Sequence, residues 1–312
     1  MIPNTEWERD WVRDHQPPKA KFSLAVIPDT QELAAQYRDK LAAIMQWIAD
    51  HKEEENIRFA ADMGDVSWNG HLKNDLGHGE YAAAVKARDI LLEAGVEYSL
   101  CYGNHDYTPR EGGVRDTELL NTYFAKIRDF ASLGGVKETG KVDNTYFTFE
   151  ADNKDFLLLS LECCPDEDTI RWADEVVGAH PRHNAIVATH VYLDIDGTKT
   201  AYAEELWEKL VKKHRNIFLV LSGHMENHRD PGSMAFRQDT GDHGNTVYQI
   251  MANAQDVDVA RGGVGILLMV RFTEDGRLDF HYFSPFHNGW AFKACNQFSV
   301  TLPEGLLMER AL

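Results

Sequence analysis

The sequence lacks a long apolar run. Its longest apolar stretches, such as Phe156–Leu159 and Gly265–Val270, fall far short of the ~20 residues that a membrane-spanning helix needs. The first twenty residues are charged and contain no apolar core of a secretory leader. We therefore expect no membrane span and a cytoplasmic protein, or a secreted or periplasmic one if a leader has been removed.

Basic residues and paired cysteines are also scarce. The chain has 32 Lys and Arg against 50 Asp and Glu, a formal net charge of −18. Affinity for nucleic acid comes mainly from Lys and Arg that replace counterions on phosphates, so duplex nucleic acid is not an expected partner. The cysteines contain no CxxC pair, which argues against a disulfide scaffold or a four-cysteine zinc site; they are Cys101, Cys163, Cys164 and Cys295. The adjacent pair Cys163–Cys164 follows an apolar run, and we interpret it as packing rather than redox chemistry.

What is present is ordinary for a globular protein. Of the 312 residues, 43% are hydrophobic and 26% are charged. Internal repeats, low-complexity tracts and a Pro/Gly/Ser-rich linker are missing. We therefore expect one domain over residues 1–312, with residues 1–20 as an extended N-terminal segment. The sequence does not indicate an oligomeric state.

Strand-like and helix-like segments alternate along the chain. Early strands are expected at Phe22–Pro28, Ile57–Met63 and Glu97–Tyr102, with amphipathic helices at Glu32–Lys52 and at Tyr81–Ala94, before Gly95. Short connections between them favour parallel pairing. Later helices are expected at Thr169–Gly178 and Tyr202–His214, and later strands at Asn144–Glu150, Asp155–Leu161, Asn184–Thr189, Ile217–Ser222, Thr246–Ala252, Gly263–Phe272 and Arg277–Phe283. The pattern predicts an α/β fold, a sandwich of two sheets flanked by helices, with Trp68–Gly79 as a polar loop.

Five of these strands end in residues that commonly bind metal ions. The clusters are Asp29-Thr30-Gln31, Gly64-Asp65, Gly103-Asn104-His105-Asp106, Thr189-His190 and Gly223-His224-Met225-Glu226-Asn227-His228. The carboxyl ends of parallel strands meet at one crevice of an open α/β sheet, so we expect the clusters to converge there. Carboxylate, amide and imidazole groups without thiolate suit Mn, Fe, Zn or similar divalent ions. Each of these residues taken alone could have a purely structural role, such as a helix cap for Asp29, but the joint pattern favours a metal centre.

In the order and content of these clusters, the sequence resembles the calcineurin-like metallophosphoesterase superfamily. That superfamily has Asp-x-His, Gly-Asp, Gly-Asn-His-Asp/Glu, a further His and Gly-His-x-His in this order, and the match runs from Asp29 to Glu226. The stretches Gln249–Gln255 and His281–Phe286 look like a bacterial branch that carries Asp-Thr-Gln. The resemblance implies a four-layer α/β/β/α sandwich and hydrolysis of a phosphate monoester or diester by a metal-activated water.

The resemblance also implies a role for each matching residue. Asp29 would bind the first of two ions and Asp65 would bridge both, while the second ion would be bound by Asn104, His190 and His224. His105 would not be a ligand. It would approach the leaving-group oxygen as a proton donor, and Asp106 would orient its ring.

Two departures from the family pattern fall on the first metal position. Gln31 stands in place of a histidine, and Glu226 stands in place of the final histidine of Gly-His-x-His. The site would then be weak or labile and would favour Mn, Mg or Ca over Zn. His228 is an alternative ligand two residues further on. Arg229 and Arg237 are candidates for contacting the substrate phosphate.

Three functions remain open on this sequence. The first is a metal-dependent phosphohydrolase of a small phosphate ester. The second is a binding protein that holds one ion and a phosphate-bearing ligand without turnover. The third is a hydrolase that uses the same metal centre on a non-phosphate ester. The sequence carries no readable code for the substrate.

Overall fold

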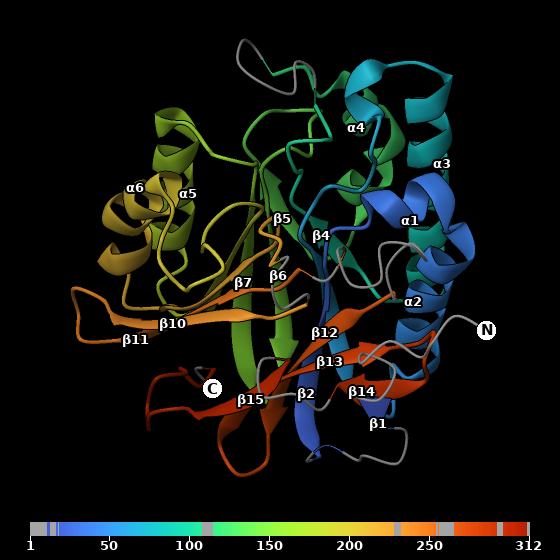
Figure 1. The fold of residues 1–312 in the computed structure, drawn as a ribbon. Coiled ribbons are helices and arrows are strands. Elements are labelled where there is room, and N and C mark those ends of the chain that lie inside the picture. The colour runs from blue at the N-terminus through green and yellow to red at the C-terminus, as the bar shows by residue number, and fades with distance from the viewer. Residues whose placement is uncertain are drawn as a thin grey trace.

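Two β-sheets lie face to face in the computed structural model, which describes residues 11–12, 17, 19–107, 115–227, 232–253, 255, 265–291 and 296–310 (Figure 1). The first sheet has the order β1-β14-β13-β12-β2-β3-β4, with β15 paired to β13. Among its described strands, the neighbours β2, β3 and β4 pair in parallel, and the other pairs are antiparallel. The strands of this sheet are β1 (Trp11–Val12), β2 (Ala20–Ile27), β3 (Ile57–Asp62), β4 (Tyr98–Leu100), β12 (Leu267–Thr273), β13 (Arg277–Ser284), β14 (Gly289–Ala291) and β15 (Gln297–Thr301).

The second sheet has the order β10-β11-β9-β8-β7-β6-β5. Its four central strands, from β11 to β7, are parallel. The strands of this sheet are β5 (Leu133–Val136), β6 (Thr145–Ala151), β7 (Lys154–Leu161), β8 (Asn184–Thr189), β9 (Ile217–Ser222), β10 (Ala235–Thr240) and β11 (Thr246–Met251). Both sheets are therefore mixed: the parallel strands lie at one end of the first sheet and at the centre of the second.

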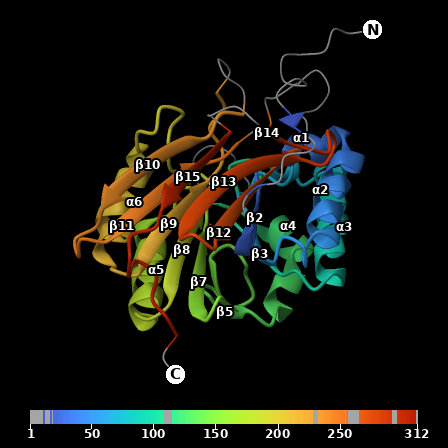
Figure 2. The same ribbon diagram turned by 90° about the horizontal axis from the view of Figure 1, so that it is seen from below.

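Helices cover the outer faces of the two sheets (Figures 1 and 2). The helices α1, α2 and α3 lie against the first sheet, and α5 and α6 lie against the second. The helices are α1 (Gln31–Gln36), α2 (Arg38–Asp50), α3 (Asp75–Glu93), α4 (Glu118–Tyr123), α5 (Glu167–Ala179) and α6 (Ala201–Lys209), with 3₁₀ turns at Gly70–Leu72, Ala125–Asp129 and Val211–Lys213. No helix within the described ranges has both the length and the apolar character needed to cross a membrane.

Aromatic side chains fill the space between the sheets. Phe22 of the first sheet meets Phe156 of the second edge to face, with ring centroids 5.2 Å apart. Phe59 of β3 packs against Phe147 of β6 at 5.3 Å. Burying such rings removes a large apolar area from water, which is the main force that holds two sheets together. The expected α/β sandwich of two sheets flanked by helices is confirmed.

The predicted elements are found with three main differences. The helix expected over Glu32–Lys52 is two helices, because the backbone breaks at Tyr37 (φ −131°, ψ 56°) while the apolar spacing continues through the break. Helix α3 begins at Asp75, where the Asn74 side chain accepts hydrogen bonds from the backbone amides of Leu76 and Gly77, so residues 75–79 of the expected loop Trp68–Gly79 are helical. The sequence pattern did not predict the strands β5, β10, β14 and β15 or the helix α4. Most of residues 1–20 lie outside the described ranges.

Candidate metal centre

The predicted ligand clusters follow strands of both sheets. Asp29 follows β2, Asp65 follows β3 and Asn104 follows β4, while His190 and His224 follow β8 and β9. These strands are parallel within each sheet, so their carboxyl ends open toward the same side of the molecule. The two sheets thus bring residues that are far apart in the sequence to one place, as the strand-end argument predicts.

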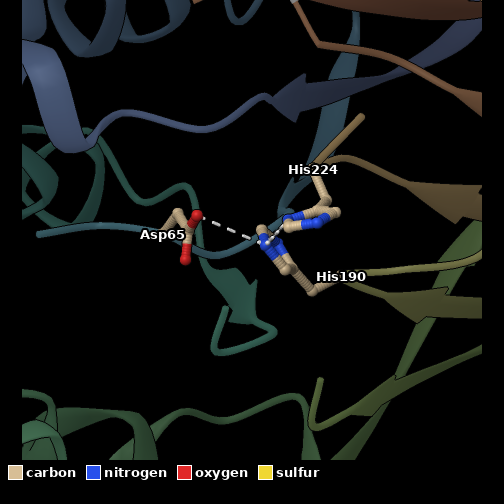
Figure 3. Close-up of side chains that lie close together, drawn as sticks. All are labelled: Asp65, His190 and His224. Atoms are coloured by element: carbon tan, nitrogen blue, oxygen red, sulfur yellow. Dashed lines mark hydrogen bonds and ion pairs between the residues drawn. The ribbon is translucent and has the colours of Figure 1, made fainter. Parts of the chain in front are cut away.

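The centre of the cluster is the Nε2 atom of His190. It lies 3.4 Å from Oδ2 of Asp65, 3.2 Å from Oδ1 of Asn104 and 3.1 Å from Nδ1 of His224. Figure 3 shows the Asp65 carboxylate and the His224 ring on either side of the His190 ring. One ligand atom from each of Asp65, His190 and His224 lies within 4.8 Å of the others, which is close enough for a single ion to contact all three.

The other nitrogen of His190 fixes the orientation of the ring. Nδ1 lies 2.7 Å from the backbone oxygen of Met63, and this oxygen can only accept a hydrogen bond. Nδ1 therefore carries a proton, and Nε2 is the ring nitrogen that faces the cluster and can bind an ion when it is not protonated. Metal-binding histidines commonly donate their second N–H to a carbonyl in this way.

The electrostatic potential in this cluster favours a positive charge. Burial alone would lower the pKa of His190, but the carboxylates of Asp65 and Asp29 outweigh it and raise this pKa to about 10. Burial also raises the pKa of Asp29 well above its ordinary value, and the nearby Asp65 and Glu226 carboxylates add to this. Carboxylates gathered in a buried place need a cation, so the residues present fit a divalent metal ion.

Asp29 lies beside His224 and is held by the backbone. Its two carboxylate oxygens accept from the backbone N–H of His224 at 3.2 and 3.1 Å, and Oδ2 also accepts from the Asn253 side chain at 3.1 Å. Asn253 follows β11, which is parallel to β9 and ends at the same edge. Sequence reasoning did not assign Asn253 to the site, because a single amide after a strand is a weak signal.

The two residues that depart from the family pattern also reach the cluster. The Gln31 amide donates to Oδ2 of Asp65 at 3.3 Å, and its Oε1 oxygen is buried without a hydrogen-bond partner. Such an orphaned oxygen is costly unless it binds an ion or a water. The Glu226 carboxylate accepts a hydrogen bond from the side chain of Gln255, a further site residue that the sequence did not reveal.

His105 and Asp106 lie in the loop after β4. The backbone N–H of His105 donates to Oδ1 of Asp65 at 2.9 Å, and ring Nδ1 donates to the Trp68 carbonyl at 3.1 Å. The Asp106 carboxylate instead accepts from backbone amides, at 2.9 Å from Gly103 and at 3.1 Å from Val66. The Trp68 carbonyl thus orients Nδ1 of the His105 ring, and the Asp106 carboxylate joins the loops after β3 and β4.

The backbone conformation and the close packing at the site restrict which residues can occupy several positions. Asp65 (φ 49°) and His224 (φ 68°) both adopt the left-handed conformation, which costs free energy for non-glycine residues and is typical of functional sites. A Cβ atom at Gly103 would lie 2.0 Å from Oδ1 of Asp65, and one at Gly223 would lie 2.3 Å from Oδ1 of Asp29. Both glycines are therefore required by the space that the carboxylates occupy.

The remaining candidates are Arg237, His228 and Arg229. Arg237 lies on β10 and pairs with Asp239, with 2.6 Å between Nε and Oδ2. His228 and Arg229 lie outside the described residues.

Comparison with known proteins agrees with this geometry. A family model described as calcineurin-like phosphoesterase matches residues 22–226, and the chain belongs to this family of metal-dependent phosphoesterases. An uncharacterized protein of Bacillus subtilis, YvnB, is 25% identical over 266 residues, which cover 84% of this chain and 20% of YvnB. The chain thus spans about a fifth of the length of that relative.

Two solved structures share the fold. A dimetal phosphatase from Danio rerio superposes with a TM-score of 0.56 at 13% identity, covering 91% of this chain and 99% of the other. A purple acid phosphatase from yellow lupin seeds (Lupinus luteus) gives a TM-score of 0.55 at 10% identity, covering 91% of this chain and 54% of the other. At these identities the likeness concerns the fold.

Proposed function

We propose that this protein hydrolyses a small phosphate monoester or diester with the help of one or two divalent metal ions. The observation that carries the proposal is the position of His190 Nε2 among the side chains of Asp65, Asn104 and His224. Membership of the calcineurin-like phosphoesterase family supports the same activity.

The ions would be Mn, Fe, Zn, Mg or Ca, held by residues already described. Asp65, Asn104, His190 and His224 are the proposed ligands of one ion, and Asp29 and Asp65 with Gln31 and Glu226 are those of another. Bound ions of this kind lower the pKa of a coordinated water and neutralise charge on the phosphate. The role of the chain is to hold these ligands rigidly, through the Met63 carbonyl at His190 and the His224 amide at Asp29.

His105 is the proposed proton donor to the leaving-group oxygen. Its Nδ1–H is fixed on the Trp68 carbonyl, and its backbone N–H is fixed on Asp65. The ring is therefore oriented relative to the carboxylate that is proposed to bridge the ions. We propose that Asp106 acts through the backbone of this loop, since its carboxylate accepts from Gly103 and Val66.

We further propose that the first ion, at Asp29, is bound more weakly than the second. Gln31 offers a neutral oxygen where an imidazole would bind more strongly, and Glu226 is held by Gln255. Metal analysis of the purified protein by mass spectrometry, over a series of Mn²⁺ concentrations, tests this. We expect one ion per chain at low Mn²⁺ and a second only at higher concentration. Two ions of equal occupancy in anomalous scattering would contradict the proposal.

The activity itself is tested with aryl phosphate monoesters and diesters in the presence of Mn²⁺. We expect metal-dependent hydrolysis by the native protein and none by Asp65→Asn, which removes the shared anion. A metal-loaded protein that binds phosphate but shows no rate above background would instead support a binding protein. Hydrolysis of aryl carboxylate esters alone would support the third function.

Replacing His105 with alanine separates catalysis from metal binding. We expect turnover to fall by ~10²–10⁴-fold, the range for general acid–base groups, while the metal content stays unchanged. His78→Ala is the matched control, because His78 lies on α3 and contacts Tyr123. Loss of metal in His105→Ala would show that His105 is a ligand, contrary to the proposal.

A further inference from the structure

The adjacent thiols of Cys163 and Cys164 follow a strand that neighbours the one leading to a proposed metal ligand. They follow β7, whose neighbour β8 leads to His190. The two Sγ atoms are 3.7 Å apart, so both side chains turn to the same side of the chain. Cys163 is buried, whereas Cys164 is partly exposed and has a left-handed backbone (φ 52°). The pair thus combines one accessible thiol with one buried thiol in contact.

We propose that Cys163 and Cys164 are a reversible oxidation site that closes to an adjacent disulfide and thereby lowers the activity of the neighbouring metal centre. The effect on activity rests on the proposed function, but the oxidation does not. The packing role that the sequence suggested is also present, because Cys163 belongs to the core and Cys164 packs against it.

The reaction needs an oxidant, for which we name a low-molecular-weight disulfide such as oxidised glutathione. The Cys164 thiolate attacks one sulfur of the oxidant, which forms a mixed disulfide and releases one thiol. The Cys163 thiolate then attacks the Cys164 sulfur, which forms the Cys163–Cys164 bond and releases the second thiol. The protein gives up two electrons and the oxidant accepts them, and the two protons leave with the released thiols.

The surroundings assign different roles to the two thiols. The hydrogen bond from the Cys163 thiol lowers the pKa of Cys164, and the Arg115 guanidinium acts in the same direction. Arg115 is held close by its hydrogen bond to the Cys164 carbonyl at 2.5 Å. The same contact with Cys164, together with burial, raises the pKa of Cys163 well above its ordinary value. The accessible Cys164 is therefore suited to attack first, and Cys163 to follow.

The product is expected to reopen easily. Adjacent residues have Cα atoms about 3.8 Å apart. Most disulfides join Cα atoms about 4.4–6.8 Å apart, and departures from that range make the bond more reducible. A bond between Cys163 and Cys164 is therefore suited to a reversible change.

Two hydrogen bonds connect this segment to the proposed metal ligands. The backbone N–H of Cys163 donates to the Tyr102 carbonyl at 3.1 Å, two residues before Asn104. The Thr189 hydroxyl, directly before His190, donates to the Glu162 carbonyl at 3.2 Å. Closing the ring would require the backbone at Cys163 and Cys164 to rotate, so both connections would be disturbed.

Peptide mass spectrometry tests the oxidation directly. Trypsin cleaves after Lys154 and Arg171, so residues 155–171 contain both thiols and no other cysteine. After treatment with oxidised glutathione we expect this peptide to lose two hydrogen atoms and to recover them on reduction with a phosphine. A stable glutathione adduct on Cys164, or no change under excess oxidant, would overturn the proposal.

Activity with an aryl phosphate tests the effect on the site. We expect oxidation to lower activity about 10- to 100-fold, the range seen when groups that support metal ligands are changed. Cys164→Ser should resist the loss, and Cys101→Ser, a buried thiol beside Ser160, should behave like the native protein. Melting temperatures show whether each variant is folded, and Cys164→Ala replaces a variant that is not.

The outcomes distinguish this proposal from the proposed function. Closure of the disulfide with unchanged activity would overturn the link to the metal centre. A reduced, metal-loaded protein without any hydrolysis would count against the proposed function alone, because the mass measurement does not depend on activity.

Discussion

Arg88 and Asp62 form an ion pair in which neither side chain has exposed surface. Nε of Arg88 donates to Oδ2 of Asp62 at 2.7 Å, and Nη2 also donates to the Thr30 hydroxyl at 3.3 Å. The other oxygen of Asp62 accepts from the backbone N–H of Gly64 at 3.1 Å. The pair therefore connects helix α3 to the two loops that follow β2 and β3 and carry Asp29 and Asp65.

Removing one partner of this pair should destabilise the protein strongly. Arg88→Met leaves the Asp62 carboxylate buried without its cation, so we expect the free energy of unfolding to fall by about 3–5 kcal/mol. Urea denaturation of the metal-free protein measures it. Arg171→Met is the matched control, because its pair with Asp168 is exposed and should contribute less than about 1 kcal/mol. Equal losses in the two variants would refute the structural role of the buried pair.

A methyl group at Gly103 should disturb the metal centre. Its Cβ would lie 2.0 Å from Oδ1 and 2.6 Å from Cγ of Asp65, so the carboxylate must move. We expect Gly103→Ala to lower metal affinity by about 10- to 100-fold, as changes next to metal ligands commonly do. Titration with Mn²⁺ measures the affinity. Gly178→Ala on α5 is the control, because the nearest atom to its Cβ is 3.8 Å away. Unchanged affinity in Gly103→Ala would show that Asp65 is not needed for the ion.

The sequence predicts the frame of the fold well, because its central strands are buried on both faces. The strands Asn184–Thr189 and Ile217–Ser222 have the same bounds in the structure as in the prediction, and every residue in them is buried. The edge strand β10 has the same length but contains only one buried residue, so its apolar pattern is weaker. The helix breaks at Tyr37 although its apolar residues keep their helical spacing, so the hydrophobic pattern of the sequence could not predict the break.

At the site, strand ends in the sequence indicated which residues gather, and the structure brings Asp65, Asn104, His190 and His224 into contact. The partners that hold them could not be read in the same way. Every residue has a backbone carbonyl, so the sequence cannot indicate that the carbonyl of Met63 orients His190. Arg88 lies in the middle of a helix, where a charged residue gives no sign of a buried ion pair. Asn253 and Gln255 follow a strand that was predicted, but one amide after a strand is too common a feature to indicate a ligand.

Divalent metal should stabilise the folded protein through His190. A ligand that binds only the native state stabilises it by about 2.7 kcal/mol at a 100-fold excess over its Kd. We expect Mn²⁺ to raise the melting temperature of EDTA-treated native protein and to have little effect on His190→Ala. His243→Ala, a change at an exposed turn, should respond like the native protein. The comparison uses the increment caused by Mn²⁺, so a lower starting stability of His190→Ala does not affect it. A full increment in His190→Ala would remove this residue from the ligand set.

Asp239 should make a pH-dependent contribution to stability. Partial burial alone would raise its pKa, but hydrogen bonds from Arg237, Lys199 and Gln249 outweigh it and lower the pKa to about 2. In the unfolded chain the pKa of an aspartate is about 3.9. The contribution of Asp239 is therefore fully present above about pH 4 and is lost as the pH falls through 2.

Because Asp239 is partly exposed, solvent screens its ion pairs, and we expect Asp239→Asn to cost on the order of 1 kcal/mol at neutral pH. Urea denaturation of the native protein and of Asp239→Asn at a series of pH values gives the difference in their free energies of unfolding. This difference should stay constant from neutral pH to about pH 4 and shrink below it. A difference that grows as the pH falls would mean that the Asp239 carboxylate is protonated more readily in the folded protein than in the unfolded chain, so its hydrogen bonds with Arg237 and Lys199 would not stabilise the charged form.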